Sequence, residues 1–251
     1  MPSVIKILTS SAQNNIFFQD FLTFLRESEK VPFELVNTGT DNVKVKEIKR
    51  LGEAFQHDIY HRDNEGNIMF AIRTEDDFPY ISWMKQLAKV MNLTFTRNKK
   101  IKLSKHGKIF LMTLDPAIQY QEMVKAYLLK SDWRYINLHR AEAVSKLQDH
   151  QLSIWRLLLE DTIQYIEAKS FYETITVNLL KNRKQKSILE HMDENDSYKW
   201  VIEKAIVRML RTFGLIDTEE TPSQYGGNDI VGFRLNQSGV IILEKIVREF
   251  V

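Results

Sequence analysis

Apolar residues recur at helical spacing through most of the chain and predict a mainly helical protein. The first such stripe consists of Ile16, Phe17, Phe21, Phe24 and Leu25. Residues 43–55 and 80–91 carry similar stripes, which place the apolar side chains on one face of a helix. Thr74 and Asp77 have the spacing of a helix-start signal, and Pro79 delays the helix proper to about residue 80.

The middle of the chain is expected to be almost entirely helical. Asp115-Pro116 combines an N-cap residue with proline at the first helical position. A further helical stripe consists of Leu152, Trp155, Leu159, Ile163 and Ile166. Capping-box spacings that begin at Ser170 and at Ser187 predict two more helix starts.

A short segment of alternating residues interrupts the helical pattern after residue 92. The apolar members of this segment are Leu93, Phe95, Ile101 and Leu103. Alternation places every second side chain on the same side of a strand, so we expect a two-stranded hairpin with these four residues on one apolar face. Ser104 is expected to cap the helix that follows, and Gly107 lets the first turn of that helix pack close to a neighbour.

The same order of features recurs near the end of the chain. A predicted helix over residues 198–213 precedes Gly214-Leu215-Ile216, a strand with Val231, Phe233 and Leu235, and a last helix that begins after Asn236. The two copies align at Leu93 with Leu215, at Leu103 with Leu235, and at Gly107 with Gly239. Because the spacing differs only in the hairpin, the sequence indicates an internal repeat of helix, hairpin and capped helix.

Two short motifs carry a resemblance to known folds. Phe213-Gly214-Leu215-Ile216, followed by Leu235-Asn236-Gln237-Ser238-Gly239, resembles the winged-helix fold of many bacterial DNA-binding regulators. The first copy departs from that pattern at Asn92, where the fold usually has glycine. The segments 76–80 and 103–107, with Tyr127 and Trp133 downstream, look like an uncharacterised bacterial family with tandem winged-helix-like units. That resemblance covers most of the chain and implies a fold but no activity.

These observations predict a mainly α protein with two small β-hairpin wings, organised as tandem winged-helix-like units joined by a helical middle region. We expect an N-terminal helical segment over residues 1–40 and a first unit over residues 41–114. A helical middle region over residues 115–196 and a C-terminal unit over residues 197–251 follow.

Composition narrows the chemistry that this chain can perform. The 251 residues include no cysteine, which excludes disulfides, thiolate metal ligands and thiol nucleophiles. Only nine residues are glycine, and the glycine-rich phosphate loops and the nucleophile elbow are missing. No apolar run reaches the length of about 20 residues that spans a bilayer. We therefore expect a cytoplasmic protein that is not an enzyme and holds no cofactor.

The first hairpin carries a cluster of positive charge. We call Arg97, Lys99, Lys100, Lys102, Lys105 and Lys108 the basic strip. In a winged-helix unit this wing would lie beside the phosphate backbone of DNA. The alternative is a solvated hairpin, because lysine on an edge strand also prevents aggregation.

A second set of cations precedes the second hairpin. Lys204, Arg208 and Arg211, which we call the basic helix face, recur at i, i+4 and i+7 opposite apolar residues of the helix over 198–213. A recognition helix would present such a face to a major groove, but an ordinary amphipathic surface helix has the same pattern. The basic run over residues 181–186 is followed closely by acidic residues that neutralise it.

Other candidate sites have simpler explanations. His57 and His61 have the spacing at which two imidazoles on one helix chelate a metal, but no third ligand is evident, so we expect surface histidines and no metal site. The tryptophans Trp133, Trp155 and Trp200 lie in apolar helical patterns and are expected in the core.

The preferred function is a non-catalytic DNA-associated or regulatory protein whose basic wing contacts phosphates. The partners to consider are double-stranded DNA, a second copy of the chain in a homodimer, and another protein, but no membrane. The overall charge of only +2 favours the alternative, a protein-interaction scaffold that uses the region of Tyr225 to Asp229. If the six strip residues each neutralise a phosphate, the log-log slope of affinity against salt is roughly −5.

Overall fold

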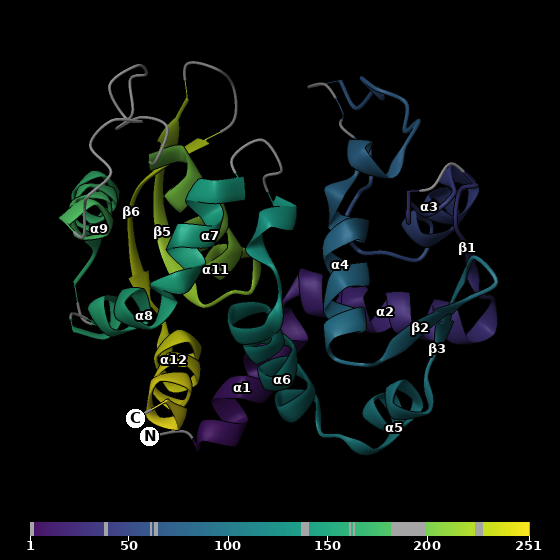
Figure 1. Ribbon diagram of the computed structural model, residues 1–251, viewed down its shortest axis with the longest axis horizontal. Coiled ribbons are helices and arrows are strands. Elements are labelled where there is room, and N and C mark those ends of the chain that lie inside the picture. The colour runs from purple at the N-terminus through teal and green to yellow at the C-terminus, as the bar shows by residue number, and fades with distance from the viewer. Residues whose placement is uncertain are drawn as a thin grey trace. The chain divides into compact units, whose positions relative to one another are not determined.

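The computed structural model describes residues 3–37, 40–60, 62, 65–136, 141–160, 162, 164–181, 199–223 and 228–250 (Figure 1). This part of the chain is mainly helical and contains two three-stranded antiparallel sheets, which confirms the coarse fold class expected from the sequence. The chain divides into two compact units, Met1–Ser131 and Asp132–Val251. Four sequence-based candidates fall wholly or partly outside the described residues, namely His61, the side chains of the 181–186 run, the cap at Ser187, and the second hairpin tip at residues 224–227.

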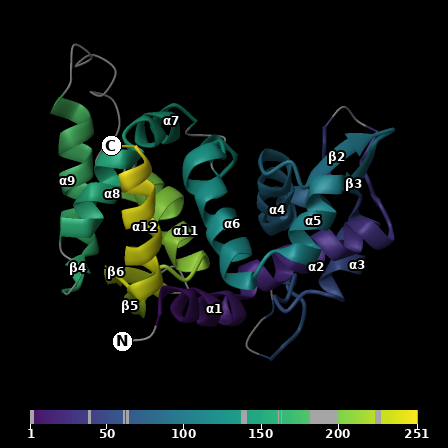
Figure 2. The ribbon, with the colours of Figure 1, turned by 90° about the horizontal axis from the view of Figure 1, so that it is seen from below.

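The first unit consists of helices around one small sheet. Its elements are α1 (Val4–Asn14), α2 (Ile16–Lys30), β1 (Phe33–Glu34), α3 (Val45–Gly52), the 3-10 helix η1 (Glu75–Asp77), α4 (Pro79–Val90), β2 (Thr94–Arg97), β3 (Lys100–Leu103), α5 (Lys105–Thr113) and α6 (Pro116–Lys130). The sheet has the order β1-β3-β2, with β3 in the middle. Figure 2 shows the hairpin of β2 and β3 and helix α3 at one end of this unit, with α1 and α6 at the other end.

Helix starts in the first unit follow the capping residues that the sequence predicts. Asp115 accepts a hydrogen bond from the backbone N–H of Ala117 at 2.8 Å, with Pro116 at the first position of α6. The capping box of Thr74 and Asp77 is present on η1, and α4 begins at Pro79. These caps satisfy backbone N–H groups that have no partner within the helix.

Helix α2 supplies much of the core of the first unit. Phe17, Phe21, Phe24 and Leu25 are almost completely buried, as their spacing predicts. Ile16, at the first position of the helix, is 49% exposed, because the buried stripe begins one residue later. Helix α3 is shorter than the predicted segment 43–55, since Val43 pairs with Leu35 in an isolated bridge instead of joining the helix.

The prediction of one apolar face on the first hairpin is wrong for one of its two strands. Thr94 lies opposite Leu103 and Thr96 lies opposite Ile101, so the core face of β2 carries threonines. Phe95 points to the other face, opposite Lys102, and is 45% exposed. Leu93 is buried, but it precedes the strand and belongs to the turn after α4, where Asn92 has a positive φ of 57°. The turn therefore separates Leu93 from the alternation of β2.

The second unit again surrounds one small sheet with helices. Its elements are η2 (Trp133–Ile136), α7 (Ala141–Asp149), α8 (Gln151–Glu160), β4 (Ile166–Glu167), α9 (Ala168–Lys181), the π-helix η4 (Glu203–Val207), α11 (Arg208–Thr212), β5 (Ile216–Pro222), β6 (Asn228–Leu235) and α12 (Gln237–Glu249). The sheet order is β4-β6-β5, so the short first strand pairs with the second strand of the hairpin in both units.

Three sequence-based expectations for the second unit are wrong. The stripe over residues 152–166 ends early, because α8 stops at Glu160 and Ile166 pairs with Phe233 in the sheet. Ser170 is not an N-cap, since α9 begins at Ala168 and the Ser170 hydroxyl donates to Glu167 at 2.5 Å. Trp133 and Trp155 are fully buried, but Trp200 is 41% exposed.

A β-bulge changes the phase of the last strand. The partners of β6 shift between Glu219 and Glu220, which pair with Gly232 and Ile230 respectively. The extra residue of a bulge has no direct partner, and here that residue is Val231. Val231 is consequently 42% exposed, while Phe233 and Leu235 are buried as expected.

The two hairpins are joined to their neighbouring helices by equivalent contacts. Leu93 accepts a hydrogen bond from Ser104 N–H at 2.8 Å, and Leu215 accepts one from Asn236 N–H at 3.1 Å. The Ser104 side chain caps Gly107 N–H at 2.9 Å, as the Asn236 side chain caps Gly239 N–H at 3.0 Å. The repeat of helix, hairpin and capped helix therefore extends to individual backbone contacts.

Within the described ranges, no helix combines the length and the apolar character required to cross a bilayer.

Candidate nucleic-acid interface

The outer face of the first sheet brings together an aromatic ring and three cations. In the antiparallel register, Phe95 lies opposite Lys102 and Arg97 lies opposite Lys100. Directly opposite residues share a face of the sheet, with their Cβ atoms about 5 Å apart. Because Ile101 and Leu103 are buried on the core side, these four residues lie on the solvent side.

The tip of this hairpin displays a lysine in an unfavourable backbone conformation. Asn98 and Lys99 have positive φ angles of 52° and 54°, as a two-residue type I′ turn requires. A left-handed conformation costs a residue other than glycine about 1 kcal/mol. The turn therefore exposes Lys99 at a position where the backbone conformation would favour glycine. The Lys99 amine lies 3.4 Å from the Asn37 side-chain oxygen.

The start of α5 continues the basic strip. The Ser104 hydroxyl donates to the Asn92 carbonyl at 2.7 Å and caps the helix, which fixes its first turn beside the hairpin. Lys105 and Lys108 are both exposed on this helix. Lys108 forms an ion pair with Glu29 at 3.1 Å.

Four of the six strip residues have no carboxylate partner within the part of the chain that the structure describes. Among the described residues, the only ion pairs of the basic strip join Lys100 to Glu34, at 3.5 Å, and Lys108 to Glu29. Lys102 is half-buried and the other cations of the strip are exposed. Arg97, Lys99, Lys102 and Lys105 are therefore the cations available to an anionic ligand.

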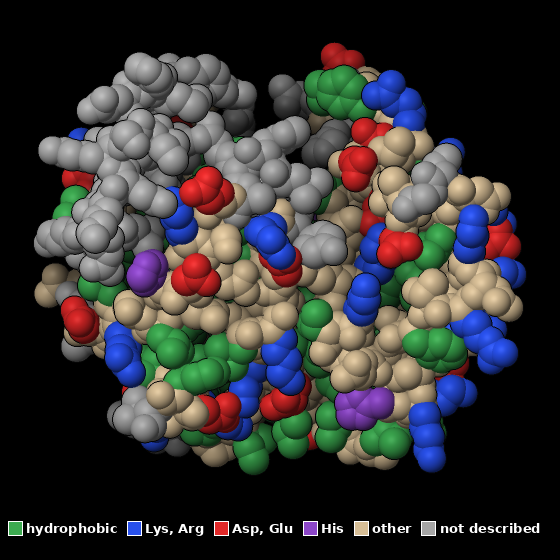
Figure 3. All heavy atoms as spheres, in the orientation of Figure 1, with side chains coloured by type: hydrophobic (Ala, Val, Ile, Leu, Met, Phe, Trp, Pro, Cys, Tyr) green, Lys and Arg blue, Asp and Glu red, His purple; other side chains and the backbone are tan. Residues whose placement is uncertain are grey.

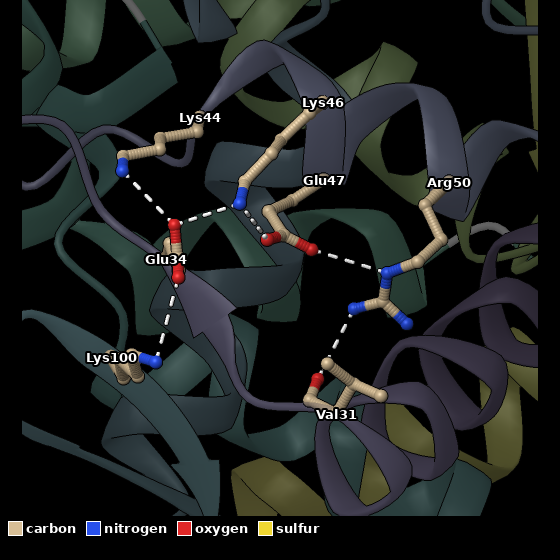
Figure 4. Close-up of polar contacts among 7 residues, drawn as sticks. All are labelled: Val31, Glu34, Lys44, Lys46, Glu47, Arg50 and Lys100. Carbon is tan, nitrogen blue, oxygen red and sulfur yellow. Dashed lines mark hydrogen bonds and ion pairs between the residues drawn. The ribbon is translucent and has the colours of Figure 1, made fainter.

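A second group of cations surrounds Glu34 beside the strip (Figure 4). The Glu34 carboxylate is 3.0 Å from the Lys44 amine, 2.8 Å from the Lys46 amine and 3.5 Å from the Lys100 amine. Hydrogen bonds from Lys46 and Lys44 lower the pKa of Glu34 from 4.5 to about 2. One carboxylate thus holds three ammonium groups together, with an excess of positive charge.

Glu47 and Arg50 complete the polar cluster on α3. Arg50 donates to Glu47 at 3.1 Å, to Glu27 at 2.9 Å and to the Val31 carbonyl at 3.1 Å. These contacts occupy the guanidinium, so Arg50 connects α3 to α2 and does not add to the free cations.

Lys44, Lys46 and Phe95 belong to the site, although the sequence pattern does not indicate them. Lys44 and Lys46 reach the strip only because β1 pairs with β3, which places Glu34 opposite Lys100. A strand of two residues leaves no recognisable alternation in the sequence. The alternation predicts Phe95 on the core face, and only the register with β3 corrects that prediction.

The distribution of charge along the chain also favours the first unit as the one that attracts an anionic ligand. Residues 1–131 contain 19 Lys and Arg against 15 Asp and Glu, which gives a formal charge of +4. Residues 132–251 contain 16 against 18, which gives −2. In Figure 3, Lys and Arg side chains gather along the edge where Figure 1 places the hairpin and α5.

Each cation of the basic helix face already has a partner within the second unit. Arg208 binds Glu203 at 2.6 Å and Arg211 binds Glu220 at 2.9 Å. The Lys204 amine lies 4.0 Å from the centre of the Trp200 ring, and burial lowers the pKa of Lys204. The apolar side of this helix is buried as predicted, but its cations are less available than those of the strip.

His57 does not lie on a helix, so the geometry that a helical histidine pair requires is missing. Helix α3 ends at Gly52, and the N–H of His57 donates to Asp20 at 3.1 Å. The His57 ring stacks on Tyr80, with ring centres 4.7 Å apart. Among the described residues, no group of three histidine or acidic side chains is arranged to hold a metal ion.

Comparisons with known proteins give no relative for this chain: no family model matches it, and no significant match occurs among curated proteins or solved structures.

Proposed function

We propose that the chain is a non-catalytic, DNA-associated or regulatory protein that contacts phosphates through the hairpin of its first unit. We also interpret residues 41–114 of the first unit and residues 197–251 of the second unit as winged-helix-like. In each unit a short strand pairs with the second strand of a hairpin, and a helix precedes that hairpin. This order of elements and the motif around Gly214 and Gly239 support the interpretation.

The proposal rests on the cations of the hairpin and α5 that have no carboxylate partner among the described residues. Arg97, Lys99, Lys102 and Lys105 are free of carboxylates in the described ranges. Surface cations release counterions from DNA when they neutralise phosphates, and this release favours binding at low salt. Arg97 adds a planar fork that can bind a phosphate through two hydrogen bonds.

The pairing of the other cations changes the expected contribution of the second unit. Arg208 and Arg211 must give up Glu203 and Glu220 before they bind phosphates, which offsets part of the gain. We therefore assign the principal phosphate contacts to the first unit and a minor role to the basic helix face.

A binding titration with matched charge variants tests the proposal. The probe is a fluorescein-labelled duplex DNA of arbitrary sequence, and fluorescence anisotropy at low salt gives its affinity for the whole chain. Replacing both Lys102 and Lys105 by glutamine removes two contacts and is expected to weaken binding at least about tenfold.

The control carries the same change of charge in the second unit. Lys146 pairs with Glu142 and Arg248 pairs with Glu244, each across one helical turn. The double variant Lys146→Gln/Arg248→Gln should keep nearly the affinity of the unmodified chain. An equal loss in both double variants would mean that overall charge, and not the hairpin, governs binding, and undetectable binding at low salt would reject the proposal.

Self-association is the second candidate, and exposed apolar residues favour it. Ile68, Met69 and Phe70 are consecutive and are 49%, 55% and 66% exposed. On α5, Met112 is 81% exposed. A large exposed apolar patch often marks a protein interface. Light scattering coupled to size-exclusion chromatography distinguishes a dimer, which this candidate requires, from a monomer.

A further inference from the structure

Phe95 is an aromatic side chain that the fold displays to solvent. The residue is 45% exposed, whereas Thr94 on the same strand is only 8% exposed. The register with β3 fixes this orientation, because Thr94 lies opposite the buried Leu103 and Phe95 lies opposite Lys102. The core therefore gains little from Phe95, and a ligand on the outer face could contact its ring.

The charges around Phe95 suit a polyanion. Lys102 is its direct cross-strand neighbour, and Arg97 lies on the same face of the same strand. The spacing of two residues along a strand places Arg97 about 6.7 Å from Phe95. Neither cation has a carboxylate partner among the described residues, so each can bind a phosphate adjacent to a group that covers the ring.

Single-stranded DNA combines the two chemistries that this face offers. Unpaired bases present flat aromatic surfaces, and stacking of one base on an aromatic side chain contributes about 1–3 kcal/mol. In a duplex the bases are stacked on one another and cannot cover an exposed phenyl ring unless they leave the helix. We propose that Phe95 stacks on an unpaired base of single-stranded DNA, while Arg97 and Lys102 hold the flanking phosphates.

This inference rests on the proposed function, because the same cations hold the DNA backbone. It adds a ligand class, since phosphate contacts alone would not distinguish an unpaired strand from a duplex. It also predicts little dependence on sequence, because every base has a face on which an aromatic ring can stack.

The test compares two probes with a series of Phe95 variants of the whole chain. The probes are a fluorescein-labelled oligothymidylate of 20 nucleotides and a blunt duplex of the same length. Phe95→Ala and Phe95→Leu remove the aromatic face, and leucine retains much of the apolar volume. Phe95→Trp keeps a stacking surface. Phe250→Ala, which removes a phenylalanine that is 54% exposed in the second unit, is the matched control.

The expected result is a selective loss of affinity for the single strand. Phe95→Ala and Phe95→Leu should weaken oligothymidylate binding roughly 5- to 150-fold, the range that corresponds to the stacking energy of one base. Their affinity for the duplex should change less than threefold. Phe95→Trp and Phe250→Ala should bind both probes as the unmodified chain does, and thermal unfolding should confirm that all variants fold.

Other outcomes distinguish failure of the inference from failure of the proposed function. If the chain binds both probes with salt dependence but Phe95→Ala leaves oligothymidylate affinity unchanged, base stacking is wrong and phosphate binding stands. If Phe95→Ala weakens both probes equally, the ring supports the hairpin and the inference is overturned. If neither probe binds at low salt, both proposals fail.

Discussion

At the scale of single residues, two glycines determine how each hairpin joins the helix after it. A Cβ atom added to Gly107 would lie 2.3 Å from the carbonyl oxygen of Leu93. A Cβ atom added to Gly239 would lie 2.1 Å from the carbonyl oxygen of Leu215. Both contacts are with backbone, which cannot rotate away as a side chain can. Glycine is therefore required here by close approach.

Gly107→Ala and Gly239→Ala should each destabilise the protein, because the first turn of the helix must move away from the hairpin. We expect a loss of about 2 kcal/mol in the free energy of unfolding for each variant, typical of an overpacked site. Chemical denaturation measures this change. The control is Lys105→Ala, which replaces an exposed residue on the same helix as Gly107. It should change the free energy of unfolding by less than about 0.5 kcal/mol. A loss no larger than that of the control would contradict the close approach.

The contacts of the Glu34 carboxylate with lysines make the stability of the folded protein depend on pH. The pKa of Glu34 in the folded protein is about 2, below the ordinary value of 4.5, because Lys46 and Lys44 donate to the carboxylate. A carboxylate with a lowered pKa stabilises the folded state above its unfolded pKa. That contribution is lost as the pH falls from about 4.5 to about 2.

Glu34→Gln should remove this contribution and make the acid-induced loss of stability shallower between pH 4.5 and pH 2. Thermal unfolding at a series of pH values compares the two proteins, and Glu244→Gln, at an exposed position on α12 of the second unit, is the control. Parallel curves for Glu34→Gln and the unmodified chain would show that the three lysines do not hold Glu34 in solution. The same variant leaves the lysines without their carboxylate and should therefore bind DNA more tightly.

At the scale of secondary structure elements, a buried carboxylate connects η1, α4 and the loop before α3. Glu75 is fully buried and accepts hydrogen bonds from the Val43 N–H at 2.5 Å and from the Ser82 hydroxyl. The Lys85 amine lies 2.7 Å from the same carboxylate and also donates to the Asp41 carbonyl at 2.6 Å. Since a buried charge without a partner is costly, this ion pair fixes α4 against the loop.

Removing only the lysine should leave an uncompensated charge in the core. Lys85→Met is expected to lower the free energy of unfolding by about 3 kcal/mol, at the low end for a broken buried pair because Glu75 keeps two other donors. The double variant Glu75→Gln/Lys85→Met should lose less than the sum of the two single variants. Urea denaturation of all four proteins gives this difference, and additive losses would mean that the two side chains do not interact.

Helix caps in this fold can be predicted from the sequence, whereas features that depend on strand pairing cannot. Caps at Ser104, Asp115 and Asn236 are correct because a cap depends on residues within one turn of the helix. The orientations that the alternation predicts for Phe95 and Val231 are wrong. Strand register determines the first and a β-bulge the second, and both depend on a partner strand. The π-helix at residues 203–207 likewise leaves no local signal in the sequence.

The candidate site is predictable only in part for the same reason. The basic strip is contiguous in the sequence, so the order of residues alone reveals its charge. The carboxylates that bind Lys100 and Lys108 are Glu34 and Glu29, more than 60 residues away in the chain. Pairing over such distances decides which cations are free, and sequence spacing alone does not contain that information.

At the scale of the whole molecule, the small overall charge conceals two units of opposite sign. The first unit carries +4 and the second carries −2, so the total of +2 understates the attraction of the first unit for a polyanion. Within the described part of the basic strip, the free cations are Arg97, Lys99, Lys102 and Lys105, on the hairpin and the start of α5. A DNA-binding function therefore does not require a chain that is basic throughout.

The dependence of duplex DNA affinity on salt is the sharpest test of the basic strip as the phosphate-binding surface. Each neutralised phosphate contributes about −0.9 to the slope of log affinity against log salt concentration, so four free cations predict a slope of about −3.6. Lys102→Gln/Lys105→Gln should reduce the slope to about −1.8, since two contacts remain. A slope near zero for the unmodified chain, or a slope that the double variant does not change, would contradict the assignment of the basic strip as the phosphate-binding surface.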